Sequence, residues 1–202
     1  MSGDQLEREV LAQGHLSVAG IDEAGRGPLA GPVYAACVLW DPAFDWRGIR
    51  DSKIIPAKER EELAQRIEQG LVCAVASASV EEIEELNILQ ATFLAMRRAW
   101  KLMAQSPAYT LVDGCWPRLE GSGRKVIRGD DLSVSCGAAS ILAKVARDRW
   151  MTEQDRLWPQ YGFAQHKGYG TPQHLAALRT HGPCAIHRRS FAPVAALQEA
   201  AT

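Results

Sequence analysis

The chain has 202 residues and a formal net charge of −1, so it can bury a full core but cannot coat nucleic acid through bulk positive charge. Its five cysteines are an odd number with no Cys-x-x-Cys pair, which argues against a disulfide framework and a thiolate zinc site. The polar, acidic N-terminus is unlike a signal peptide, and no apolar run is long enough for a membrane span. We therefore expect one domain over residues 1–202, a monomer in the reducing cytoplasm with no membrane partner.

Charge is divided unevenly along the chain. Residues 1–90 carry a net charge of −8, whereas residues 91–202 carry +7. An acidic half that holds cations and a basic half that binds a polyanion would explain this division. Solvated helix faces of unequal sign explain it equally well.

The first half of the chain predicts three strands and three helices. Apolar runs over 17–21, 33–39 and 71–77 predict the strands, and a Gly/Pro-rich turn over 25–32 separates the first two. Residues 56–69 predict a charged helix that ends just before Gly70. A capping box over 79–82 and the helix start at Asn87 predict two more, the second with an apolar stripe.

The second half continues the alternation of strands and helices. Strands are predicted over 109–112 and 125–128, and a long helix over 133–155. That helix has small residues on one side, so it can pack closely on a sheet. Thr171, Pro172 and Gly182 then bracket a short helix.

Carboxylates follow two of the predicted strands. Asp22 and Glu23 precede Gly25 at the end of the first apolar run, and Asp113 precedes Gly114 at the end of the fourth. Ligands of parallel α/β sheets bind outside the carboxyl ends of strands, so these acids converge if the two strands are neighbours. Carboxylates that close raise each other's pKa and call for bound cations. The pattern predicts a divalent-metal site for phosphate chemistry.

The Gly-rich turn decides how two adjacent acids can share a site. Neighbouring strand residues point to opposite faces, so a regular strand would separate Asp22 from Glu23. We expect the backbone to leave the sheet directly after Glu23, over Ala24 to Gly27, which turns Glu23 back toward Asp22. The same turn would present N–H groups to a sugar or phosphate.

Nine segments in order along the chain carry a resemblance to a known family. They are the string GIDEAGRGPLAGPV at 20–33, DSK at 51–53, NIL at 87–89, DG at 113–114, GD at 129–130, AASILAKVARD at 138–148, YGF at 161–163, HKGYGT at 166–171 and HRRSF at 187–191. Together they resemble type 2 ribonuclease H, the bacterial ribonuclease HII. The resemblance implies a ribonuclease-H-like α/β fold, with a mixed five-stranded sheet flanked by helices and a C-terminal helical portion over about 160–202 that grips the duplex. It also implies an endonuclease that cuts the RNA strand of RNA–DNA hybrids, and cuts 5′ to ribonucleotides embedded in duplex DNA.

The resemblance assigns the metal-binding acids position by position. Asp22, Glu23 and Asp113 match three of them, and the fourth is Asp130 or Asp148, with Asp130 ranked first. From the residues alone, Asp130 is an N-cap of the long helix and Asp148 a salt-bridge partner of Lys144. An all-oxygen set without His or Cys selects two Mg²⁺ or Mn²⁺ ions, used in two-metal hydrolysis that leaves 3′-hydroxyl and 5′-phosphate ends.

The resemblance also implies how the substrate is recognised. The backbone of Gly25, Arg26 and Gly27 and the phenol of Tyr169 read the 2′-hydroxyl, with the tyrosine ring stacked on the sugar of the next deoxynucleotide. The remaining candidates for substrate contacts are Lys53, Ser140, Lys144, Lys167, Arg188 and Arg189. His187 receives no catalytic role.

Two alternatives stay open at this point. The chain could be an integrase-like or exonuclease-like nuclease of the same broad fold, which also uses a carboxylate cluster. It could also be a module that binds hybrids without cutting them. Cleavage at an embedded ribonucleotide separates the first alternative, and dependence of cutting on Mg²⁺ or Mn²⁺ separates the second.

Overall fold

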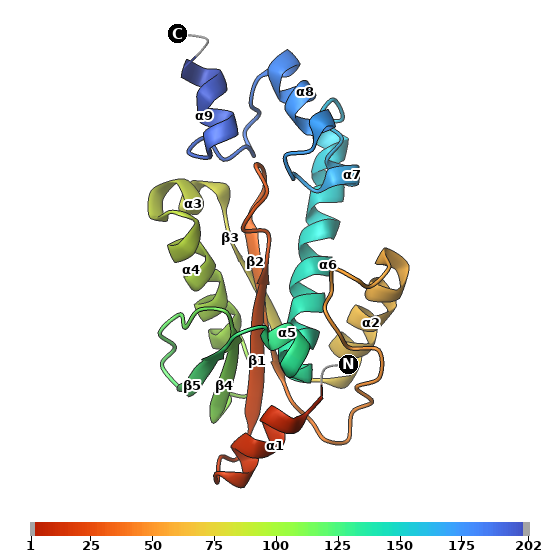
Figure 1. Cartoon of the computed structure of the whole chain (residues 1–202), viewed down its shortest axis with the longest axis vertical. Helices are drawn as coiled ribbons and strands as arrows, with labels where there is room; N and C mark the ends of the chain where they lie inside the picture. Colours follow the sequence, from red (N-terminus) through yellow and green to blue (C-terminus); the bar gives the residue numbers. More distant parts are fainter. Residues whose placement is uncertain (1–2, 200–202) are drawn as a thin grey trace.

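A mixed five-stranded sheet lies at the centre of the molecule (Figure 1), in a computed structural model that describes residues 3–199. The strands are β1 (Val18–Ala24), β2 (Val33–Leu39), β3 (Cys73–Ala78), β4 (Tyr109–Asp113) and β5 (Ser122–Val126), in the spatial order β3-β2-β1-β4-β5. β1 pairs antiparallel with β2 and parallel with β4; the β2–β3 pair is antiparallel and the β4–β5 pair parallel. The expected five-stranded mixed sheet is confirmed.

Helices cover both faces of the sheet. Alternate residues of β2 divide between two cores: Ala35 and Cys37 pack with α4 (Ile88–Lys101), whereas Ala36 and Val38 pack with α2 (Ala57–Gly70) and α6 (Val134–Leu157). The same alternation holds in β1, where Ile21 belongs to the α4 side. Asp22, the next residue, therefore lies on the α6 side.

The remaining helices are shorter. They are α1 (Gln5–Ala12), α3 (Val80–Leu86), α5 (Gly129–Leu132), α7 (Phe163–His166), α8 (Pro172–His181) and α9 (Ala192–Glu199). Figure 1 shows α8 and α9 at the end of the molecule opposite α1. A separate apolar cluster, which includes Leu29, Met151 and Phe163, joins this end to α6 and to the loop after β1. Within residues 3–199 no helix is both long enough and apolar enough to cross a bilayer.

Several elements differ from the sequence predictions. β5 is Ser122–Val126 and not 125–128, because the backbone turns out of the sheet at Arg128, whose φ is 58°. The residues of β5 are mostly polar, so no apolar alternation in the sequence marks its bounds. Gly70 is the last residue of α2 and not the residue after it. The helix α1 was not predicted, since among its residues only Glu7 and Val10 are buried.

Helix α6 packs very closely on β1, at Gly20. A Cβ atom added there would lie 2.2 Å from the backbone of Ser135 and Cys136, which a real side chain could not tolerate. The absence of a side chain at Gly20 thus lets the start of α6 touch the strand that carries Asp22. This contact sets the distance between the helix and the strand-end acids.

The buried carboxylate of Glu7 fixes the start of α6. Its Oε1 accepts hydrogen bonds from the Ser135 N–H at 3.0 Å and from the hydroxyls of Ser133 and Ser135. Glu7 is fully buried, and a carboxylate at a helix N-terminus is stabilised by the free N–H groups and the helix dipole. The first helix is therefore attached to the start of α6, in addition to the packing of Val10 with β1 and β4.

We expect the substitution Glu7→Ala to lower the free energy of unfolding by about 2 kcal/mol, because three buried donors lose their acceptor. The matched control is Glu9→Ala, two residues along the same helix, where the carboxylate makes only exposed contacts. Its effect should stay within about 0.5 kcal/mol. Urea denaturation measures both values, and equal losses would contradict the role given to Glu7.

Candidate active site

Three carboxylates meet where the pairing of β1 with β4 ends. β1 and β4 are parallel neighbours, paired through Ile21 and Val112, so Asp22 and Asp113 follow directly on adjacent strands. With Asp130 they form a cluster in which one oxygen from each residue lies within 4.8 Å of the others. The structure therefore brings together strand-end acids that lie about ninety residues apart in the chain.

Asp130 reaches the cluster from the short helix α5. The backbone turns at Arg128, and the Gly129 N–H donates a 2.5 Å hydrogen bond to Asp113 Oδ1, which holds the start of α5 against the end of β4. Asp130 lies inside α5, and the N-cap of α6 is Ser133, whose hydroxyl accepts from the Cys136 N–H. The N-cap interpretation of Asp130 is therefore wrong.

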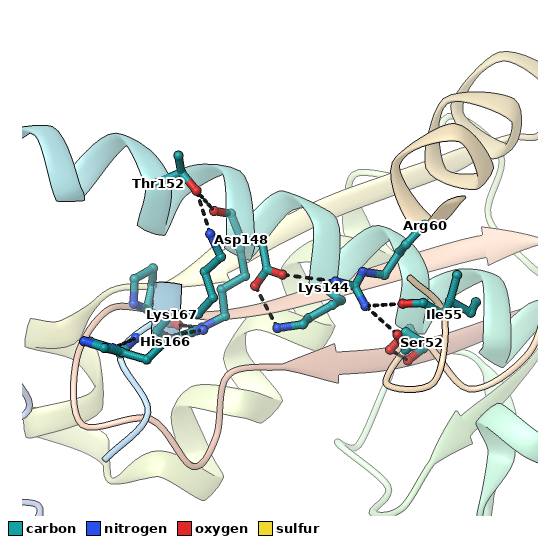
Figure 2. Close-up of polar contacts among 12 residues, drawn as sticks. Ser52, Ile55, Arg60, Lys144, Asp148, Thr152, His166 and Lys167 are labelled. Atoms are coloured by element: carbon teal, nitrogen blue, oxygen red, sulfur yellow. Dashed lines mark hydrogen bonds and ion pairs between the residues drawn. The ribbon is translucent and has the colours of Figure 1, made fainter. Parts of the chain in front are cut away.

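Asp148 lies outside the cluster. Its carboxylate is 2.8 Å from Lys144 Nζ and 3.5 Å from an Arg60 guanidinium nitrogen (Figure 2). Arg60 also donates to the carbonyls of Ser52 and Ile55. Between the two candidates for the fourth acid, the geometry places Asp130 with the other carboxylates and Asp148 in a salt bridge.

Glu23 shares the cavity of the cluster without joining its oxygens. β1 stays regular through Ala24, which pairs with Tyr34, so the backbone does not leave the sheet directly after Glu23 as expected. Among the described residues, the group of acids within ligand distance contains Asp22 and not Glu23. Glu23 instead accepts a 3.2 Å hydrogen bond from Arg26. It borders the same cavity of about 220 Å³.

The carboxylates are held in an environment that disfavours their charge. Burial raises the pKa of Asp22 well above its ordinary value, and the negative charges of Glu23 and Asp113 raise it further. Burial likewise raises the pKa of Glu23 and of Asp113. Lys53, whose Nζ is 3.6 Å from Asp130, offsets only part of this repulsion because its side chain is 76% exposed. Such a cluster is stabilised by a bound cation.

The other walls of the cavity come from the predicted substrate residues. Gly25, Arg26, Gly27, Lys53, Ser140, Lys144 and Tyr169 border it. Lys144 Nζ lies 5.9 Å from the centre of the Tyr169 ring, and an added Cβ at Gly27 would lie 3.8 Å from that ring. The Gly-rich turn and the tyrosine therefore face each other across the opening beside the acids.

Sequence comparisons agree on one family. The ribonuclease HII family profile matches residues 19–194. Ribonuclease HII of Albidiferax ferrireducens is 58% identical over 180 residues, which cover 88% of this chain and 87% of that protein. This chain belongs to the ribonuclease HII family. It is therefore a type 2 ribonuclease H.

Other relatives extend the comparison. Ribonuclease HII of Bordetella pertussis is 57% identical over 181 residues, which cover 89% of this chain and 90% of that protein. The crystal structure of ribonuclease H2 from Pyrococcus horikoshii superimposes with a TM-score of 0.77 at 25% identity, over 92% of this chain and 98% of that one. Bst-RNase HIII, solved with Mn²⁺, gives a TM-score of 0.75 at 18% identity, over 93% and 71% of the two chains. The fold of this ribonuclease HII is thus shared across types of ribonuclease H.

Two buried arginines hold the loop that follows β1. Arg188 donates to the carbonyls of Gly25, Arg26 and Gly31 at 2.6–2.9 Å. Arg147 donates to the carbonyls of Ala30, Pro32 and Lys167 at 2.9–3.1 Å. Burial lowers the pKa of Arg188 to about 9 and also lowers that of Arg147. These hydrogen bonds from both guanidinium groups go to main-chain carbonyls.

This arrangement corrects the predicted phosphate contact of Arg188. Arg188 is fully buried, so its guanidinium cannot reach a phosphate and instead holds the substrate-facing turn from behind. Lys167 borders a different cavity, of about 410 Å³, and its Nζ donates to Thr152 (Figure 2). Lys53 and Lys144 keep positions at the acid cluster, and the Ser140 hydroxyl is hydrogen-bonded to that of Ser52 at 2.8 Å.

Sequence reasoning gave no role to Arg147 or Arg60. Arg147 sits in the matched string AASILAKVARD, but an arginine in a helix is normally exposed. The one available signal was its position three residues after Lys144, on the side of α6 that faces the sheet. Nothing local marks Arg60, because its partners lie in another loop and in α6.

We expect Arg188→Met to lower the free energy of unfolding by about 3 kcal/mol, because three buried carbonyls lose their donor while the apolar stem is kept. Arg189→Met is the matched control, since the neighbouring side chain is exposed and should change stability by less than about 0.5 kcal/mol. Thermal or urea unfolding of the two variants checks the difference. A stable Arg188→Met variant would show that the loop is held by other contacts.

Proposed function

We propose that this ribonuclease HII hydrolyses the RNA strand of RNA–DNA hybrids and incises 5′ to ribonucleotides embedded in duplex DNA. Products would carry 3′-hydroxyl and 5′-phosphate ends. The observation that carries the proposal is the cluster of Asp22, Asp113 and Asp130, whose oxygens lie within 4.8 Å of one another beside the Gly-rich turn. The family membership supports the same activity.

The acid cluster fits a pair of hard divalent cations. Its donors are carboxylate oxygens, which Mg²⁺ and Mn²⁺ prefer, and burial has removed the water that would otherwise screen their repulsion. Asp22, Asp113 and Asp130 would hold the ions, with Glu23 at the side of the same cavity. When bound, two such ions activate a water and stabilise the leaving 3′ oxygen.

Residues of the chain prepare the acids for this role. The Glu23 N–H donates to Asp22 Oδ1 at 2.7 Å, and the Gly129 N–H donates to Asp113 Oδ1. These bonds orient the two carboxylates before any ligand arrives. Preorganised charges of this kind cost little reorganisation during reaction.

Recognition of the ribonucleotide would fall to the turn and the tyrosine that face each other. The backbone at Gly25 to Gly27 can approach a 2′-hydroxyl closely, and Tyr169, 45% exposed, offers a ring for the adjacent sugar. Lys53 and Lys144 border the cavity and are suited to phosphate contacts that position the duplex. Contacts to the sugar and to the phosphates do not depend on base sequence.

Cleavage mapping tests the proposed reaction. A labelled DNA duplex with one ribonucleotide should be cut 5′ to that residue in Mg²⁺ or Mn²⁺ and left intact in EDTA. Asp130→Asn should lower kcat by at least about a thousandfold, because one oxygen ligand of the cation pair is lost. Its neighbour Asp131, which pairs with exposed Arg128, provides the control Asp131→Asn, with near-normal rates. Cutting in EDTA, or a random cut position, would overturn the proposal.

We propose that Asp148 acts through Lys144 and Arg60 and not as a metal ligand. Asp148→Asn should leave the Mn²⁺ affinity within about twofold of wild type, because the carboxylate lies outside the cluster. It should raise KM for the hybrid by about fivefold, since Lys144 loses its 2.8 Å partner. Calorimetric Mn²⁺ titration and steady-state kinetics measure the two effects. A loss of Mn²⁺ affinity equal to that of Asp130→Asn would contradict this assignment.

A further inference from the structure

A chain of buried histidines lies directly behind Tyr169. His174, in α8, and His187, in the segment that follows it, are almost completely inaccessible to solvent. The Cys184 N–H donates to His187 Nδ1 at 2.9 Å, and the Nε2 atoms of His187 and His174 are 3.0 Å apart. His174 Nδ1 lies 2.9 Å from the Tyr169 carbonyl oxygen. This series of hydrogen bonds therefore ends on the backbone carbonyl of Tyr169, the residue proposed to recognise the sugar.

The partners of this chain determine where each proton lies. A carbonyl only accepts, so His174 carries its proton on Nδ1 and accepts at Nε2. His187 must then donate from Nε2, which leaves its Nδ1 free to accept from the Cys184 N–H. Each of these hydrogen bonds has one donor and one acceptor when both rings are neutral. Burial favours the neutral rings, since it lowers the pKa of His174 and lowers the pKa of His187 to about 4. The directions of all three hydrogen bonds are thus fixed.

The segment that contains His187 also holds the Gly25–Gly27 turn, which borders the same cavity as Tyr169. His187 forms a β-bridge with Ala30, and the next residue, Arg188, donates its side-chain hydrogen bonds to the carbonyls of Gly25 and Arg26. The adjacent residues His187 and Arg188 therefore connect to Tyr169 and to the Gly-rich turn through separate hydrogen bonds. One route runs through His174 to Tyr169, and the other runs through Arg188 to the Gly-rich turn.

We propose that His174 and His187 are positioning residues that, together with Arg188, fix Tyr169 relative to the Gly25–Gly27 turn and so set the preference for ribonucleotide–deoxyribonucleotide junctions. This inference rests on the proposed function of Tyr169 and of the turn. It differs from a core-filling role in what it requires. Packing needs only the volume of the rings, whereas positioning needs the donor and acceptor on each ring.

The first test needs no variant and no activity. Long-range ¹H–¹⁵N spectra of the full chain at pH 7 should show His174 as the Nδ1-protonated tautomer and His187 as the Nε2-protonated tautomer, both neutral. His174 protonated on Nε2 alone would overturn the proposal, because the bond to the Tyr169 carbonyl would then lack its proton. A cationic ring at either position would also overturn it, because two N–H donors would then face each other between the rings or at Cys184.

The second test compares variants that differ in hydrogen bonding at similar volume. The measured quantity is kcat/KM on a duplex with one ribonucleotide divided by kcat/KM on a continuous RNA–DNA hybrid. His174→Leu should lower this ratio about tenfold, because the Tyr169 carbonyl loses its donor. His174→Asn, whose amide can still donate toward that carbonyl, should restore most of the ratio. His187→Gln should likewise exceed His187→Leu.

Tyr161→Phe serves as the structural control. Tyr161 contacts the His187 ring and donates from its hydroxyl to the Gly182 carbonyl, but it makes no bond in the chain. It should lower stability without changing the ratio. Equal ratios in His174→Leu and Tyr161→Phe would overturn the positioning role.

Tyr169→Ala separates this inference from the function on which it rests. If Tyr169→Ala lowers the ratio and His174→Leu does not, the proposed function stands and the positioning role fails. If Tyr169→Ala leaves the ratio unchanged, the proposed role of Tyr169 fails, and the histidine chain loses its functional meaning with it. The double variant Tyr169→Ala with His174→Leu should lower the ratio no further than Tyr169→Ala alone, because the proposal makes Tyr169 and His174 act as one unit.

Discussion

The structure depends on two guanidinium groups that are buried against main-chain carbonyls. The loop after β1 must turn sharply beside the acid cluster, and its carbonyls would be costly to bury without donors. Arg147 and Arg188 supply those donors from α6 and from the C-terminal segment. The desolvation of each charge is offset only when its hydrogen bonds are made in full, so the loop has little freedom to adopt another shape. A rigid turn is what close recognition of a sugar requires.

Helix α6 joins most parts of the molecule. Its first turn donates hydrogen bonds to the Glu7 carboxylate and touches β1 at Gly20, which fixes the distance of the helix from the strand that carries Asp22. Further along, Lys144 reaches the active-site cavity, and one turn later Arg147 holds the loop. Because these contacts lie on one rigid helix of 24 residues, displacement at one of them would be felt at the others.

Charge in the site is arranged for a ligand and not for the free protein. Burial and mutual repulsion raise the pKa of Asp22, and the nearby cations Arg26 and Lys53 are too exposed to balance the cluster. Binding of cations would relieve a repulsion that folding has imposed. Folding therefore leaves an unfavourable electrostatic energy at the active site, which bound cations would offset.

The sequence by itself determined the family, through the nine matched segments, and the resemblance implied the five-stranded sheet. The sequence also showed that Asp22 and Asp113 follow predicted strands, because apolar runs, glycines and carboxylates at their ends are local patterns. Only the tertiary structure decided that Asp130 lies with them while Asp148 does not, and that Glu23 is not among the described acids whose oxygens lie within 4.8 Å of one another. It also decided the use of Arg188, whose side chain meets the Gly25 carbonyl 163 positions away in the chain. A charged residue carries no local sign of which distant partner it will meet, so its role is settled only when packing brings the two together.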